Sequence, residues 1–297
     1  MWYEGRTYVM RLRSLVQKPA LYAAELQLCA ALGSTASSRL RLAVETGRFH
    51  LLNRLAPRRG AEAPQRYQVQ IGGRHQDLWL RPASGDFFVL HELFLGECYF
   101  IPQHWRNDVR TVVDLGANIG LSCLYFGRYF PQAHYICVEP EPGNVELLRR
   151  NTQGLGTSVQ VLAAAVSDQA GEALFDDTRP SWGGQLRESP GPGRQVRCMT
   201  GDEILALTQT GTIDLLKIDI EGAEARLFRG PCTWLQHVGM LVIEIHAPYS
   251  LAQFECDMGR FGFSVTLPDP ALGNRLIFAH NQRLTHNPQL AQSELTL

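Results

Sequence analysis

The arrangement of apolar and polar residues changes near residue 110. From Thr111 onward, short apolar runs alternate with segments of helical periodicity, which is typical of buried parallel strands joined by helices. Turn-forming residues separate the last two runs, so we expect those two strands to pair in antiparallel fashion. The expected strands are Thr111–Leu115, His134–Glu139, Val159–Val166, Ile213–Ile220, Met240–His246, Phe263–Leu267 and Arg275–His280. The pattern predicts a doubly wound, mainly parallel α/β sheet.

The residues before this sheet follow other patterns. Residues 1–56 have helical periodicity, and Pro57–Pro64 has the composition of a linker. Two alternating segments on either side of Gly72-Gly73 predict a β-hairpin, and Phe87–Phe100 predicts an apolar helix. We therefore divide the chain into an N-terminal helical cap or extension (1–60), a hairpin with a helix (61–105), an α/β domain (106–281) and a polar C-terminal tail (282–297).

Composition and charge narrow the classes of partner. The 297 residues include 28 basic and 29 acidic side chains, so no overall positive field attracts nucleic acid. The seven cysteines form no C-x-x-C pair, which disfavours zinc and indicates reduced thiols. No apolar run is long enough to span a membrane, and the first residues lack a signal-peptide pattern. We expect a cytoplasmic protein with a small-molecule substrate, and self-association through the N-terminal helices remains an alternative.

A glycine-rich turn follows the first strand of the predicted sheet. The segment Val112–Gly120 runs from apolar residues into Asp114 and then into a G-x-x-x-G turn before the next helical pattern. Such a turn lets the backbone approach a ligand closely, and the helix N-terminus adds free N–H donors. A dinucleotide site needs a further glycine where this chain has Asn118, because the pyrophosphate requires the space. The turn therefore favours a nucleotide-type ligand without phosphates, such as S-adenosylmethionine.

Glu139 ends the second strand of the sheet. A carboxylate at this place in an α/β sheet accepts hydrogen bonds from ribose hydroxyls. The alternative is an ordinary surface carboxylate that binds no ligand. Together with the glycine-rich turn, Glu139 predicts a binding site for an adenosyl ribose.

Charged residues recur at the end of the fourth and fifth strands. Lys217, Asp219 and Glu221 alternate along the chain, so in a strand they lie on one face. Because burying unpaired charges is costly, we expect them at the carboxyl end of the sheet, where ligands bind in open α/β folds. Glu244 and His246 form a second polar end. The alternatives are structural: a buried ion pair for Lys217 and a hydrogen-bonding role for His246.

Three segments carry a resemblance to a known family. They are VVDLGANIG (112–120), VEP (138–140) and DLLKIDIEGAE (214–224), the last followed by VIEIH (242–246). They resemble the FkbM family of S-adenosylmethionine-dependent methyltransferases over about residues 85–280. The resemblance implies a class I methyltransferase (Rossmann-like) fold, with a seven-stranded, mainly parallel sheet whose last strand is antiparallel. It also implies methylation of a hydroxyl on a sugar, a polyketide or a related natural product.

The resemblance also implies positions for the cofactor contacts. The residues it places around the methionine end are Asp114, Gly116, Asn118 and Gly120. Glu139 would bind the ribose, and residues 165–168 would border the adenine. Further cofactor contacts are expected at Ala117, Pro140 and Asp219. Many class I enzymes have an acid near Ala165, so here Ser167 or Asp168 would take that part.

Methyl transfer to a hydroxyl requires alignment of the acceptor and removal of its proton. His246 is the first candidate for the base and Asp219 the second. Lys217 would stabilise the developing alkoxide or pair with Glu244, and Glu221 shares their face. In a metal-dependent alternative, Mg²⁺ bound by Asp219, Glu244 and His246 would polarise the hydroxyl.

Other features leave the acceptor and two competing functions open. The Pro/Gly-rich segment Asp176–Gly193 predicts a lid over the acceptor, and Trp182 within it would stack on a sugar or pack against the protein. A nicotinamide-dependent oxidoreductase would share the acid after the second strand, but the missing middle glycine counts against it. A non-catalytic protein that retains the cofactor-binding fold is the other alternative, and the intact motifs count against that one.

Overall fold

A seven-stranded sheet forms the centre of the molecule. The computed structural model describes residues 17–55, 63–82, 84–96, 98–99, 101, 103–106, 108–176, 183–187, 191–267 and 276–284. The strands of the sheet are β3 (Thr111–Leu115), β4 (His134–Glu139), β5 (Val159–Ala163), β10 (Ile213–Ile218), β11 (Val238–Glu244), β12 (Phe263–Thr266) and β13 (Leu276–Asn281). Their order is β12-β13-β11-β10-β3-β4-β5, and all pairings are parallel except those of β13. The expected class I methyltransferase architecture is confirmed.

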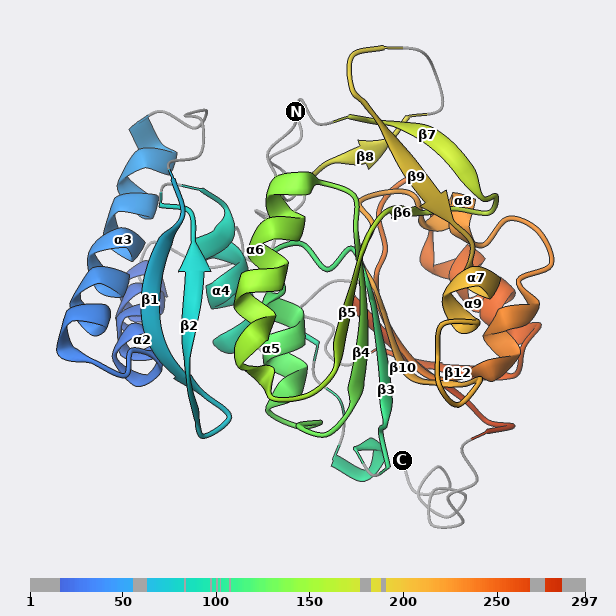
Figure 1. Cartoon of the computed structure of the whole chain (residues 1–297), viewed down its shortest axis with the longest axis horizontal. Coiled ribbons are helices and arrows are strands. Elements are labelled where there is room, and N and C mark those ends of the chain that lie inside the picture. The colour runs from blue at the N-terminus through green and yellow to red at the C-terminus, as the bar shows by residue number, and fades with distance from the viewer. Residues whose placement is uncertain are drawn as a thin grey trace.

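Helices cover both faces of this sheet, which is why its inner strands are largely apolar (Figure 1). One face carries α4 (Asp86–Phe94), α5 (Leu121–Gly127) and α6 (Pro142–Thr152), and the other carries α7 (Gly201–Leu205), α8 (Glu224–Leu227) and α9 (Leu251–Gly259). Side chains of β3 alternate between two apolar cores, Val112 on the α5 face and Val113 on the opposite face. By the same alternation Asp114 lies on the α5 face, where Ser122 donates a hydrogen bond to it.

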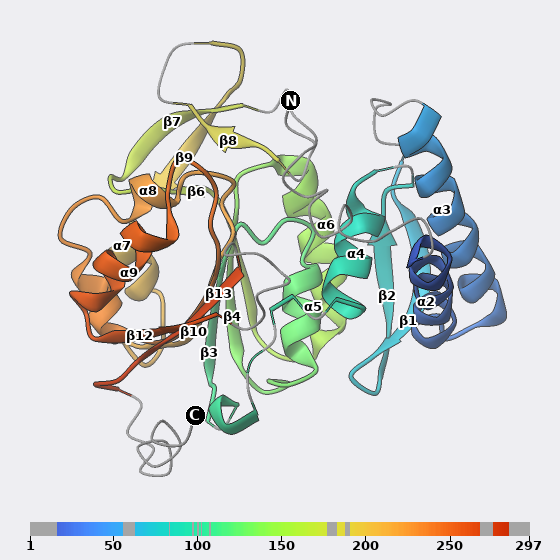
Figure 2. The same cartoon turned by 180° about the vertical axis from the view of Figure 1, so that it is seen from behind.

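The N-terminal elements form a further layer outside α4, α5 and α6 (Figures 1 and 2). They are α2 (Gln17–Leu32), α3 (Ala36–Leu55), β1 (Gln65–Ile71) and β2 (Arg74–Leu80). Asn151 of α6 accepts a hydrogen bond from the Trp79 N–H (2.7 Å) and donates one to the Ile119 carbonyl (2.8 Å), so it ties the hairpin to the glycine-rich turn. Helices and a hairpin occur where the sequence predicts them. The boundary expected at residue 60, residues 1–16 and the tail beyond 284 lie outside the described residues.

A second, four-stranded sheet was not predicted from the sequence. It contains β6 (Ala165–Val166), β7 (Gly171–Asp176), β8 (Gln185–Leu186) and β9 (Arg194–Met199), in the order β6-β9-β7-β8. The single strand expected over Val159–Val166 is split at Ala164 between the two sheets. The expected lid, Asp176–Gly193, contains β8, but its residues 177–182 and 188–190, with Trp182, lie outside the described residues.

The helix expected over Phe87–Phe100 is shorter than predicted. It ends at Phe94, where the N–H groups of Leu95 and Gly96 both donate to the His91 carbonyl and close the last turn. Short 3₁₀ helices, η1 (Gln103–Trp105), η2 (Gln153–Leu155) and η3 (Thr233–His237), lie in the connections. Within the described residues, no helix combines the length and the apolar character that crossing a membrane requires.

Candidate functional site

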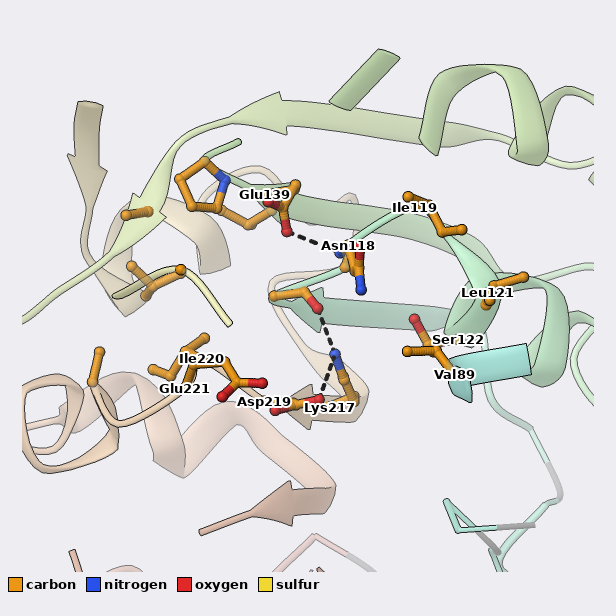
Figure 3. A pocket seen from close by; sticks show the side chains of 18 of the residues that line it. Val89, Asn118, Ile119, Leu121, Ser122, Glu139, Lys217, Asp219, Ile220 and Glu221 are labelled. Atoms are coloured by element: carbon orange, nitrogen blue, oxygen red, sulfur yellow. Dashed lines mark hydrogen bonds and ion pairs between the residues drawn. The ribbon is translucent and has the colours of Figure 1, made fainter. Parts of the chain in front are cut away.

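An open cavity lies at the carboxyl ends of β3, β4 and β10. Its volume is about 900 Å³, which includes open space at its mouth. Glu139 and Asn118 lie on one side of it, and Lys217, Asp219 and Glu221 lie on the facing side (Figure 3). Residues of α4 and of the small sheet complete the wall. The cavity therefore brings together the three segments that the sequence singled out.

The glycine-rich turn owes its shape to contacts within the protein. Gly116 has φ +78°, and a Cβ there would lie 1.9 Å from the Asp219 carbonyl oxygen. Gly120 has φ +86°, and a Cβ there would lie 2.7 Å from Leu148 of α6. Asn118 adopts φ +50°, a conformation that non-glycine residues rarely take. The glycines thus let this turn pack closely against the Asp219 segment and α6. Close approach of a ligand is not the only reason for them.

Glu139 is buried at the end of β4 and lines the cavity. Its carboxylate accepts hydrogen bonds from the N–H of Asn118 (2.9 Å), the N–H of Glu141 (2.9 Å) and the side-chain amide of Asn144 (3.2 Å). Burial raises the pKa of Glu139 to about 7, although these hydrogen bonds act in the opposite direction. Glu139 therefore changes charge near neutral pH.

Lys217 lies beneath the cavity and is fixed by the turn. Its Nζ lies 3.0 Å from Asp114 Oδ1 and donates a hydrogen bond to the Gly116 carbonyl (2.7 Å). Both side chains are buried, with relative exposures of 2% for Lys217 and 0% for Asp114. Burial lowers the pKa of Lys217, but the charges of Asp114 and Asp219 outweigh it and raise the pKa above its ordinary value. The pair Lys217–Asp114 occurs in place of the pairing with Glu244 that the sequence suggested.

Carboxylates surround His246 just beyond the end of β11. Its Nδ1 lies 3.0 Å from Glu224 Oε1, and its Nε2 lies 3.4 Å from Glu244 and 3.6 Å from Glu221. Burial lowers the pKa of His246, but Glu224 and Glu244 outweigh it and raise the pKa to about 11. At neutral pH this arrangement favours the imidazolium, which cannot accept a proton. The carboxylates thus oppose the role of general base that we expected for His246.

Asp219 is the side chain that connects this cluster to the cavity. Its Oδ2 accepts a hydrogen bond from the Tyr99 hydroxyl (2.9 Å) and lies 4.0 Å from Lys217 Nζ. Its Oδ1 is buried without a hydrogen-bond partner in the described part of the chain. Sequence reasoning missed Tyr99, which lies 120 positions away in the segment Phe87–Phe100 that was expected to be an apolar helix. It also missed Glu92 of α4, which lines the cavity.

Several expected contacts lie elsewhere. Ser167 donates a hydrogen bond to Asp168 (3.0 Å), and Asp168 pairs with Arg226 (3.2 Å), outside the lining of the cavity. At the place expected for adenine the lining consists of Ala164, Ala165, Val166, Phe175 and Leu186. Asp114 and Gly120 do not line the cavity either, because they support the turn from below. Gly116, Ala117 and Pro140 do line it.

Comparison with known proteins gives a consistent result. A family model described as Methyltransferase FkbM domain matches residues 114–264, slightly more than half of the chain. The chain is 26% identical over 135 residues to the hexuronic acid methyltransferase AglP of Haloferax volcanii, covering 45% of this chain and 55% of AglP. It is 24% identical over 193 residues to the 31-O-demethyl-FK506 methyltransferase FkbM of Streptomyces tacrolimicus, a match that covers 54% of this chain and 74% of that protein.

Sequence identity to the solved structures is lower than to these relatives. The 16S rRNA N2 G1207 methyltransferase RsmC of T. thermophilus, solved with AdoMet and guanosine, has 17% identity and a TM-score of 0.39. That match covers 74% of this chain and 51% of RsmC. The chain thus spans about half the length of AglP and of RsmC.

Proposed function

The chain belongs to the FkbM methyltransferase family, and from that premise we propose that it transfers a methyl group from S-adenosylmethionine to a hydroxyl of a small molecule such as a sugar or a polyketide. The observation that carries the proposal is the cavity itself. A buried, hydrogen-bonded Glu139 lies on one side of it and the carboxylates Asp219 and Glu221 lie on the other. The first side suits an adenosyl ribose, and the second suits a hydroxyl that must lose a proton.

The residues present fit the adenosyl cofactor. A carboxylate offers about four acceptor positions, and three of those on Glu139 are used by Asn118, Glu141 and Asn144. Glu139 can therefore accept one ribose hydroxyl without rearrangement. The apolar residues Val166, Phe175 and Leu186 offer a surface on which adenine would lie. When bound, the cofactor supplies an electrophilic methyl group on a sulfonium, and the protein aligns the acceptor and manages its proton.

The opposite wall would receive the acceptor. Asp219 Oδ1 is unpartnered among the described residues and buried beside the cavity, so it can accept a hydrogen bond from the acceptor hydroxyl. Tyr99 fixes the other oxygen of the same carboxylate. Val89, Glu92 and Leu93 of α4 line the cavity, which supports a role for the N-terminal region as a cap over the acceptor.

The charges of the lining favour a neutral acceptor. Glu92, Asp219 and Glu221 are acidic, and the cation in the described lining, Lys217, is held by Asp114 and the Gly116 carbonyl. An acceptor with its own carboxylate would be repelled here unless a bound cation intervened. AglP is named for a hexuronic acid, so a neutral polyol distinguishes this proposal from a direct transfer of that relative's substrate.

The proposal is tested by incubating the purified protein with S-adenosylmethionine and a panel of acceptors. Neutral sugars, a hexuronic acid and a hydroxylated macrocyclic polyketide are compared, with S-adenosylhomocysteine and the methylated product measured by mass spectrometry. We expect O-methylation of a neutral hydroxylated acceptor. Methyl transfer to nitrogen or carbon, or reduction with a nicotinamide cofactor, would contradict the proposal.

The affinity for the cofactor should depend on pH through Glu139. Its pKa is about 7 in the free protein, and only the carboxylate fully accepts the ribose hydrogen bond. Below pH 7 a proton must leave before binding, so the Kd of S-adenosylhomocysteine should rise by up to about tenfold per pH unit. Calorimetry at several pH values checks this result.

Two variants sharpen that measurement. Glu139→Gln should bind more weakly above neutral pH and lose the pH dependence. Glu146→Gln makes the same chemical change on the exposed side of α6, so it should behave like the wild type. A Kd that is independent of pH in the wild type would remove Glu139 from the ribose site.

A further inference from the structure

Three side chains that could bind a metal ion meet at the acceptor side of the cavity. One ligand atom from each of Asp219, Glu221 and His246 lies within 4.8 Å of the others. Asp219 and Glu221 line the cavity, whereas His246 comes from the end of β11 and lies behind them. The parallel pairing of β10 and β11 brings these segments to the same edge of the sheet. The sequence suggested Glu244 in place of Glu221, and Glu244 lies 3.4 Å from His246 Nε2.

His246 is oriented as metal-binding histidines usually are. Its Nδ1 lies 3.0 Å from Oε1 of Glu224, whose side chain is fully buried. A histidine ligand almost always gives its second ring nitrogen to a carboxylate or carbonyl, which fixes the ring and directs the other nitrogen at the ion. Its Nε2 is buried, with the side chain only 9% exposed, and lies 3.4 Å from Glu244 and 3.6 Å from Glu221 without hydrogen-bond alignment to either. This nitrogen therefore faces the carboxylate cluster, and a divalent cation would take the place of its proton.

We propose that Asp219, Glu221 and His246 bind one divalent cation at the acceptor end of the cavity. One imidazole nitrogen with two carboxylates suits Mn²⁺ or Zn²⁺ better than Ca²⁺, which takes oxygen ligands. The second unsatisfied atom of the cluster, Asp219 Oδ1, lies on the side of the cavity and supports the same assignment. Glu221 has φ +53°, a strained conformation of the kind that is retained at ligand sites.

The cation would have a defined part in methyl transfer, and this part, unlike the binding itself, rests on the proposed function. Asp219, Glu221 and His246 would hold it where negative charge develops on the acceptor oxygen. The acceptor O–H bond breaks and its proton leaves to water in the open cavity. The oxygen electron pair forms the new O–C bond, and the C–S bond breaks with its electron pair remaining on sulfur.

Such a site also bears on the choice of acceptor. A cation between the lining carboxylates and the acceptor would reverse the local charge that disfavours an acidic substrate. Chelation by neighbouring hydroxyls, or by a hydroxyl beside a carboxylate, then becomes the chemistry that selects the acceptor. Added Mn²⁺ should therefore widen the range of acceptors from neutral polyols to acidic ones.

Binding of Mn²⁺ to the full-length protein tests the inference directly. Electron paramagnetic resonance of free Mn²⁺ should show one site per chain in the wild type. Glu221→Gln should weaken that site at least tenfold, whereas Glu172→Gln, the same change on exposed β7, should leave it unaltered. His246→Asn retains an N–H donor toward Glu224 but removes Nε2, so it should weaken Mn²⁺ binding while the protein remains folded.

Calorimetry with S-adenosylhomocysteine on the same preparations separates this inference from the proposed function. If the cofactor product binds but Mn²⁺ does not, or if Glu221→Gln leaves the Mn²⁺ affinity intact, the cation site is overturned and the methyltransferase proposal stands. If Mn²⁺ binds in the expected way but the cofactor product does not, the cation site stands and the proposed function fails.

Discussion

Replacing Lys217 with methionine is expected to lower the free energy of unfolding by about 3–5 kcal/mol, because it leaves the Asp114 carboxylate buried without its cation. Asp114 is fully buried and lies 3.0 Å from Lys217 Nζ. The same ammonium donates to the Gly116 carbonyl, so its loss also releases the glycine-rich turn. Urea denaturation of the two proteins measures the difference.

A double variant distinguishes the ion pair from simple loss of packing. Asp114→Asn combined with Lys217→Met removes both charges, and it should recover most of the lost stability. The hydroxyl of Ser122, which donates to Asp114, can still donate to the asparagine oxygen. If Lys217→Met were as stable as the wild type and only slowed turnover, Lys217 would act on the acceptor, as the sequence first suggested.

Replacing His246 with alanine is expected to lower kcat by about 10²–10³-fold, the usual range for losing a group that stabilises developing charge, because the imidazole is part of the proposed cation site beside the acceptor. The Kd of S-adenosylhomocysteine should change by less than about threefold, because His246 does not line the cavity and lies beside Glu221 and Glu244, away from Glu139. Steady-state kinetics and calorimetry on the same preparation give both numbers.

Two further variants control for folding. His246→Asn retains a donor for the buried Glu224, so a matching loss of kcat would show that Nε2 is the group that matters. His75→Ala changes an exposed histidine of β2 and should leave kcat unaltered. Equal losses of kcat and cofactor affinity in His246→Ala would instead indicate that His246 supports the whole cavity.

The central sheet could be predicted because its inner strands β3, β4, β10 and β11 are buried on both faces and therefore largely apolar. The boundaries of β3 and β4 agree with the prediction, and those of β10 and β11 differ from it by no more than two residues. The small sheet was missed because β7 and β9 are only partly buried and have short apolar runs. Their pairing with β6 and β8 depends on contacts that are distant in the sequence.

The site was predictable in its parts but less so in its connections. The motifs and the alternation of side chains along a strand placed Glu139, Asp219 and Glu221 at one edge of the sheet, and the structure brings all three to the cavity. That alternation could not show that Lys217 pairs with Asp114, since both lie in apolar runs. Nor could it show that Tyr99 reaches Asp219, because nothing near Tyr99 distinguishes it from a core residue.

The same limit applies to His246. Its position at the end of β11 suggested a base, but its charge state depends on Glu221, Glu224 and Glu244, which two separate segments of the chain bring together. Two of those acids belong to the motif around residue 220, so their presence was evident from the sequence. Their distances from the imidazole ring, which decide its chemistry, required the fold.

The central claim is that the cavity between Glu139 and Asp219 holds an adenosyl cofactor for methyl transfer. Calorimetric titration of the purified protein with S-adenosylmethionine, S-adenosylhomocysteine and NAD tests it most directly. We expect one site per chain with micromolar affinity for both adenosyl compounds, no binding of NAD, and a large loss of affinity in Glu139→Ala. Preference for NAD, or binding of the adenosyl compounds that Glu139→Ala leaves unchanged, would contradict the account.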